Sequence, residues 1–142
     1  MADAGYSGTP LPQKLGLKDG QRVLFIALPK DLKDLRKSRH FIEIAEAGWE
    51  TFADGDPGYD VIHGFTSSRA VLEAAAKRLM GQIARDGSIW ISWPKKASKV
   101  ATDITEDVIR EVVLPIGLVD VKVAAVSEIW SGLKLVIRKE LR

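Results

Sequence analysis

Short apolar runs alternate along this chain with segments whose apolar residues recur at helical spacing. Turns, prolines or glycines bound the runs at 22–28, 60–65, 88–93 and 119–126. A short, almost unbroken apolar run is typical of a strand buried on both faces, as in a parallel sheet. We therefore predict a strand at each of these places, and a last strand at 133–141, where apolar and charged residues alternate.

Two helices are predicted between these strands. The first follows Thr66–Ser68, which offer N-caps, and we expect it to end before Gly87, a residue suited to a left-handed C-cap. The second is predicted to begin at Asp103, because Glu106 three residues on resembles a capping box, and to close at 115–117.

The segment 29–46 has a less regular pattern. Pro29 suits a helix start, but the apolar residues that follow fit one helical face imperfectly, so we expect a helix with a break near Ser38. A short strand is then predicted at 49–52, and a short helix ahead of all the strands at 10–17.

Strands and helices that alternate in this order predict an α/β, three-layer, Rossmann-like fold. We expect a mainly parallel sheet of about six strands, with helices on both faces. The connection before the last strand is short, so the C-terminal strands form an antiparallel hairpin. The length predicts a single domain over residues 1–142, in which the small and polar residues 1–9 form a flexible arm.

Composition narrows the classes of function. The chain has no cysteine and two histidines, which excludes a disulfide framework, a zinc–thiolate site and a histidine-rich metal site, and we expect no metal. A net charge of +2 gives no strong case for a nucleic-acid partner. The start lacks the pattern of a signal peptide and no apolar run approaches membrane length, so we expect a cytoplasmic protein without a membrane partner.

The order of elements from residue 60 to 142 resembles the C-terminal half of class I methyltransferase-like domains. The N-terminal half is abbreviated, because 28–60 has room for one helix–strand unit where that fold has two. The resemblance implies a truncated methyltransferase-like topology and S-adenosylmethionine as the family's cofactor.

Several segments also resemble a family of small uncharacterised bacterial proteins, known as a domain of unknown function. That resemblance covers nearly the whole chain and implies almost nothing about activity. The segments that carry it are Gly5–Leu11, Ser92–Ala97, Thr105–Glu111, Gly117–Val123 and Ile129–Lys134.

In an open parallel sheet, ligands bind beyond the carboxyl ends of the strands. We call this edge the carboxyl-end rim, and its candidate ligand-binding residues are Pro29, Lys30, Thr66, Ser67, Ser68, Trp93, Pro94, Lys95, Lys96, Trp130 and Ser131.

Each group of rim residues has a functional and a structural interpretation. Thr66–Ser68 open a helix whose free N–H groups can bind an anion, or they simply cap that helix. Lys95 and Lys96 can supply cations to the anion, or keep a loop solvated. Trp93 and Trp130 can form a stacking surface for a ring, or cover the ends of the core.

The loop after the first strand, Ala27–Lys30, contains no glycine, although a cofactor that approaches the backbone usually requires one. This disfavours S-adenosylmethionine. Asp54, expected near the end of the second strand, is a candidate to bind a ribose. The alternative is that Asp54 is simply a polar residue of a solvated turn. His63 is expected to be packed and hydrogen-bonded, and we assign no catalytic residue.

The sequence is compatible with three functions. The first is the one we favour, and it involves no enzymatic activity. It is a non-enzymatic methyltransferase-like domain that binds a small anionic ligand or a protein partner at the carboxyl-end rim. The alternative is an S-adenosylmethionine-dependent methyltransferase with an atypical cofactor loop. A second alternative is a nucleotide or nucleic-acid binder that uses Lys30, Lys95, Lys96 and Trp93.

Apolar residues of the last two strands belong either to the core or to a homodimer contact: Val119, Val121, Val123 and Leu135.

Overall fold

The structure is a computed structural model that describes residues 8–142. The flexible arm expected at 1–9 therefore lies, for residues 1–7, outside the described residues. Six strands form one sheet: β1 (Arg22–Ile26), β2 (Glu43–Ala47), β3 (Tyr59–Phe65), β4 (Ile83–Pro94), β5 (Leu118–Ala125) and β6 (Trp130–Ile137).

The order of strands across the sheet is β2-β1-β3-β4-β6-β5. β1 pairs in parallel with β2 and β3, and β3 pairs in parallel with β4, whereas β6 is antiparallel to both β4 and β5. The mainly parallel six-stranded sheet with an antiparallel C-terminal hairpin is therefore confirmed. The order reverses direction between β1 and β3, which is the topological switch point of the sheet, the place where folds of this kind have their ligand crevice.

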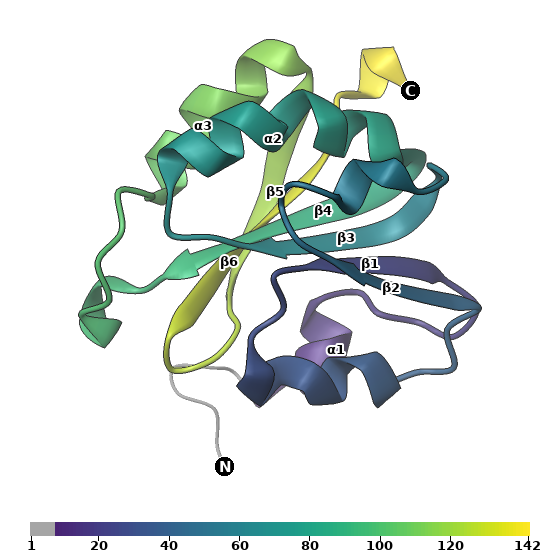
Figure 1. Ribbon diagram of the computed structural model, residues 1–142, viewed down its shortest axis with the longest axis horizontal. Coiled ribbons are helices and arrows are strands. Elements are labelled where there is room, and N and C mark those ends of the chain that lie inside the picture. Colours follow the sequence, from purple (N-terminus) through teal and green to yellow (C-terminus); the bar gives the residue numbers. More distant parts are fainter. Residues whose placement is uncertain (1–7) are drawn as a thin grey trace.

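Helices cover both faces of the sheet, which gives three layers (Figure 1). α2 and α3 lie on one face, and α1 and η1 lie on the other. The helices are α1 (Leu11–Lys14), α2 (Arg69–Gln82) and α3 (Glu106–Val113), with the 3₁₀ helices η1 (Lys30–Lys37), η2 (Phe52–Asp54), η3 (Lys96–Ser98), η4 (Leu114–Ile116) and η5 (Lys139–Leu141).

Two apolar cores follow from the alternation of side chains along the strands. Ile89 and Ile91 of β4 pack toward α2 and α3, in a core that includes Leu72 of α2. Trp90, between them, points to the other face and packs with Leu15 and Leu35, near α1 and in η1. Its indole N–H donates to the Leu15 carbonyl over 3.1 Å, which ties the N-terminal segment to the sheet. The unbroken apolar runs are explained by this burial on both faces.

The helix predicted at 29–46 is wrong beyond its first half. Only Lys30–Lys37 is helical, as η1, and Glu43–Ala47 is the strand β2. The segment alternates in a period of two, with Glu46 bound to η1 and Ala45 packed on the opposite core. The strand predicted at 49–52 is wrong in turn, since this segment is a turn that leads into η2.

The end of α2 also differs from the prediction. α2 ends at Gln82, and β4 begins at once with Ile83, which pairs with Tyr59. Gly87 is therefore a strand residue rather than a left-handed cap. A Cβ at Gly87 would lie 2.8 Å from the Asp60 carbonyl oxygen, so close strand packing requires glycine there.

Two further element boundaries differ from the prediction. α3 is capped by Thr105, whose hydroxyl accepts from the Val108 amide, and not by Asp103 as predicted. β6 begins at Trp130 and ends at Ile137, three residues earlier at its start than expected. Of the residues considered for a homodimer contact, Leu135 is fully buried in the core, whereas Val121 and Val123 are exposed.

Candidate functional site

The structure brings most of the predicted rim together at one edge of the sheet. Pro94, at the carboxyl end of β4, is the register partner of Trp130 at the start of β6. The Lys95 amide donates to the Ile129 carbonyl over 2.7 Å, and the Thr66 amide donates to the Ser92 carbonyl over 3.0 Å. The loops after β3 and β4 and the turn before β6 are thereby held side by side.

The two rim tryptophans do not form a shared surface. Trp93 pairs with Ser131, one step out of phase with Trp130, and neighbouring residues of a strand point to opposite faces. Trp93 is buried in the core beneath α2 and α3, and Trp130 packs on the other core, edge-on to Phe65 at 5.3 Å between ring centroids. Their contacts are those of residues that cover the ends of two different cores.

The N-terminus of α2 is already satisfied by the chain itself. The Ser68 hydroxyl accepts from the Val71 amide over 3.3 Å, and the Thr66 hydroxyl accepts from the Ser68 amide over 3.1 Å. Asp103 reaches in from the loop before α3 and accepts from the Arg69 amide over 2.7 Å. A carboxylate of the protein thus lies where an external anion was expected to bind, and the capping interpretation of these hydroxyls fits the geometry.

Three lysines supply the positive charge of the rim. Lys30 and Lys96 are exposed and Lys95 is half-buried, after β1 and β4. Within residues 8–142 none of the three forms an ion pair. They are the groups of the rim that are free to meet an anion.

Trp49 lies at the switch point of the sheet, and the sequence did not indicate it. Its indole N–H donates to the Phe65 carbonyl at the end of β3 over 2.8 Å. A Cβ added to Gly64 would lie 2.5 Å from the indole ring, so the ring occupies the space that a side chain at 64 would fill. Because β1 lies between β2 and β3, the segment after β2 must cross the end of β1 to put the ring there. Phe52 of η2 supports the ring edge-on at 5.9 Å.

A buried polar pair lies just beneath the rim. His63 Nε2 lies 2.7 Å from the Ser92 hydroxyl, and the imidazole is stacked on Phe65 at 4.2 Å. Burial lowers the pKa of His63 to about 3, so the ring is neutral and a poor base near neutral pH. Both side chains are fully enclosed, which leaves no access for a substrate. His63 is therefore packed and hydrogen-bonded, as the sequence predicts.

The residues of the crevice do not fit S-adenosylmethionine in the manner of its usual sites. The loop after β1 has Pro29 and the buried Leu28 where a cofactor needs bare backbone, although Ala27 adopts the left-handed conformation with φ 57°. Asp54 lies on η2 and not at the end of β2, so it is not placed for a ribose. Glu46, close to the end of β2, is held by Lys33 and by Arg36 at 2.8 Å.

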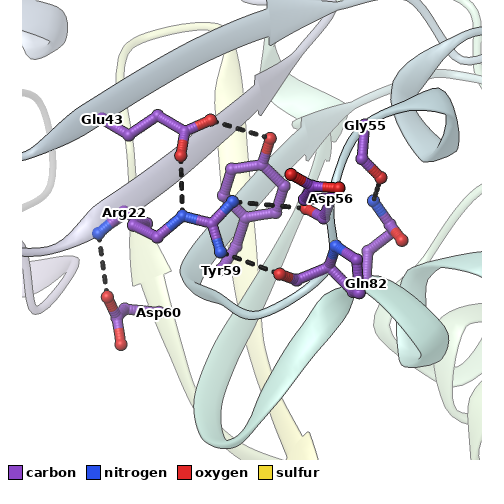
Figure 2. Close-up of polar contacts among 8 residues, drawn as sticks. Arg22, Glu43, Gly55, Asp56, Tyr59, Asp60 and Gln82 are labelled. Carbon is purple, nitrogen blue, oxygen red and sulfur yellow. Dashed lines mark hydrogen bonds and ion pairs between the residues drawn. The ribbon is translucent and has the colours of Figure 1, made fainter.

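A second polar cluster lies at the opposite, amino end of the strands (Figure 2). The Arg22 guanidinium binds Glu43 at 2.7 Å and the carbonyls of Asp56 and Pro57, and it lies 4.6 Å from the centroid of the Tyr59 ring. Its contacts tie β1, β2 and the turn before β3 together. The guanidinium is engaged within the protein, so this cluster stabilises the fold.

The six-stranded sheet, its helical layers and its antiparallel hairpin define the Rossmann-like fold of class I methyltransferases. A methyltransferase from Aquifex aeolicus described as SAM-dependent has a TM-score of 0.66 at 15% identity, with 88% of this chain and 86% of that chain covered. A TehB-like SAM-dependent methyltransferase from Corynebacterium glutamicum gives 0.55 at 13%, over 84% and 82%. The fibrillarin pre-rRNA processing protein of Methanococcus jannaschii gives 0.58 at 11%, over 85% and 68%.

These likenesses show the fold, since the identities are low. No model of a protein family matches the chain, and no curated protein matches it either. The resemblance to a bacterial family of unknown function therefore stays a prediction. Among residues 8–142, no helix has the length and apolar composition to cross a bilayer, and no group of acidic or histidine side chains is arranged to hold a metal ion.

Proposed function

We propose that this chain is a methyltransferase-fold domain without methyl-transfer activity that binds a small anionic ligand at the carboxyl-end rim. The observation that carries this proposal is Trp49, whose ring lies against Gly64 at the switch point and whose N–H donates to the Phe65 carbonyl. With that space taken, the chemistry left open on the rim is the positive charge of Lys30, Lys95 and Lys96. A protein partner with acidic groups would meet the same lysines, and the cytoplasm is the proposed location.

A second candidate is an S-adenosylmethionine-dependent methyltransferase with an atypical cofactor loop. Solved structures of similar fold favour it, because two of them are described as SAM-dependent methyltransferases. Trp49 would then have to leave the crevice before the cofactor could enter. Binding to the wild type would consequently be weak, and removal of the indole would strengthen it.

Titration calorimetry with S-adenosylmethionine and S-adenosylhomocysteine separates the two candidates. The proteins compared are the wild type, Trp49→Ala and Trp130→Phe, the last as a control for loss of an indole elsewhere on the rim. Micromolar binding by the wild type would refute our proposal in favour of the methyltransferase, and so would weak binding that Trp49→Ala strengthens and Trp130→Phe does not. Absence of binding by the wild type is the result we expect.

The anionic ligand is tested with citrate and inorganic phosphate at low ionic strength. We expect saturable binding that Lys95→Gln/Lys96→Gln weakens, while Lys37→Gln/Lys139→Gln, with the same loss of charge on exposed lysines elsewhere, leaves it unchanged. A single-stranded oligonucleotide tests the nucleotide or nucleic-acid alternative, which predicts affinity that falls steeply with salt. Equal loss in both double variants would mean that the rim binds no anion specifically.

A further inference from the structure

The C-terminal hairpin carries two lysines directly opposite each other. Lys122 of β5 and Lys134 of β6 are register partners. Side chains of such partners share one face of the sheet, with Cβ atoms about 4.5–5.5 Å apart, and like charges in this position destabilise the pair. The fold therefore holds two cations together at a cost that a hairpin with one neutral side chain would avoid.

A β-bulge removes the nearest acid from this face. The register of β5 shifts between Asp120 and Lys122. Asp120 consequently points to the α3 side, where it accepts from Arg110 over 2.9 Å, while Lys122 lies on the α1 side with its Nζ 5.9 Å from the Trp90 ring centroid. A bulge commonly re-aims side chains in this way.

A third lysine completes the group. Lys18, in the loop before β1, lines a cavity of about 330 Å³ together with Lys134 and Val136. Burial, then Lys122 and Lys18, lower the pKa of Lys134. In the part of the chain that the structure describes, none of the three lysines forms an ion pair.

Two carboxylates, Asp60 and Asp86, line the same cavity. Asp60 accepts from the Arg22 amide over 2.8 Å, and Asp86 is exposed. Neither carboxylate forms an ion pair with one of the three lysines in the described part of the chain. The three ammonium groups are thus without a carboxylate in direct contact.

We infer that Lys18, Lys122 and Lys134, which we call the hairpin lysines, bind a phosphate group on the α1 face of β5 and β6. A compact anion with two negative charges would turn the repulsion between the paired lysines into attraction, and charge-assisted hydrogen bonds from ammonium groups to phosphate oxygens are short and strong. Val119 and Val136, register partners on this same face, offer apolar contact to whatever bears the phosphate. This site is separate from the carboxyl-end rim, because Lys134 lies four positions along β6 from Trp130.

The test is a titration of the chain of residues 1–142 with pyrophosphate at low ionic strength, monitored by two-dimensional amide NMR. We expect saturable shifts at the amides of the hairpin lysines, and affinity at least about tenfold weaker in Lys122→Gln/Lys134→Gln, which removes two charge-assisted contacts. The control Lys37→Gln/Lys139→Gln has the same change in net charge and should bind as the wild type does. Because the shifts are read residue by residue, failure here is distinguishable from failure at Lys95 and Lys96 of the rim.

Two outcomes would overturn the inference: shifts that do not saturate, or equal weakening in both double variants. A single-stranded oligonucleotide added in a second arm identifies the source of the phosphate. Competition with pyrophosphate for the hairpin lysines would indicate a nucleic-acid backbone, and its absence a small phosphorylated molecule.

Thermal unfolding without ligand supplies an independent readout. Lys134→Gln removes the repulsion from Lys122, so this variant should melt at a higher temperature than the wild type while it binds pyrophosphate less well. A lysine with only a structural role would lose stability on substitution, and that result would contradict the inference.

Discussion

His63 should make the folded state sensitive to acid, and this is the sharpest prediction of the structure. Its imidazole is only 1% exposed, with Nε2 shared with the Ser92 hydroxyl and Nδ1 without a hydrogen-bond partner. Protonation would place a charge and a second N–H donor in an apolar enclosure. The pKa of His63 is therefore lowered from its ordinary value to about 3.

The sign and size follow from proton linkage. Because the pKa is lower in the folded state, the unfolded chain binds more protons, so stability is full above the ordinary histidine pKa and is lost as the pH falls. With an unfolded pKa near 6.5, the loss is about 2 kcal/mol at pH 5 relative to pH 8. The carboxylates with lowered pKa values, Glu46 and Asp120, lose their contributions at still lower pH, so the window from pH 5 to pH 8 isolates the histidine.

Urea unfolding at half-unit steps between pH 5 and pH 8, followed by tryptophan fluorescence, measures this loss. His63→Gln and His63→Leu are both compared, because the slope with pH and not the absolute stability is the readout. We expect either variant that folds to lose most of the slope. His40→Gln, which removes the exposed histidine, should keep it.

A wild-type stability that changes by less than about 0.5 kcal/mol over this range would refute the reasoning, since burial of a neutral imidazole requires the loss. A slope retained in His63→Gln would refute it as well, because the protons would then be taken up elsewhere. A slope lost in His40→Gln would transfer the effect to the surface.

Further predictions concern four single positions, each measured as a shift in the urea midpoint at pH 7.5. Gly64→Ala should cost about 1–3 kcal/mol because its Cβ would meet the Trp49 ring at 2.5 Å, and the cost should nearly vanish in a Trp49→Ala background; an equal cost in both backgrounds would place the strain elsewhere. Ala27→Gly should stabilise by up to about 1 kcal/mol, and Lys99→Gly likewise, because both residues have positive φ; destabilisation would mean that the side chains contribute more than the strain costs. Asp103→Ala should cost about 1 kcal/mol by leaving the first amide of α2 without its acceptor, and no change would show that water replaces the carboxylate.

The strands were predictable where burial alone decides them. β1, β3 and the second half of β4 are buried on both faces. A short apolar run of this kind is typical of a strand inside a parallel sheet. β2 was not predictable in this way, because it is a half-exposed edge strand that contains Glu43 and Glu46. Its conformation comes from pairing with β1, which is a tertiary interaction. The end of α2 was missed for the same reason, since Ile83 leaves the helix to pair with Tyr59.

The candidate site was predictable as a location and not as a set of contacts. The rule for parallel sheets gathered Thr66, Pro94 and Trp130 correctly at one edge, because it needs only the direction of each strand. Whether two rim side chains share a face depends on the register between β4 and β6, and that register cannot be derived from the sequence alone. The opposite faces of Trp93 and Trp130 follow once Pro94 is known to pair with Trp130.

The position of β2 also decides what occupies the crevice. With a strand at 49–52, Trp49 would lie within the sheet and Asp54 would reach the rim as a candidate for a ribose. With β2 at Glu43–Ala47, Trp49 instead lies in the turn after β2, beside the switch point. Asp54 lies on η2, next to Gly55, whose carbonyl accepts from Gln82 at the end of α2. A shift of a few residues therefore exchanges a candidate ligand contact for an aromatic ring that fills the space. Removal of that ring is accordingly the change that most directly asks whether the crevice of this fold still accepts a cofactor.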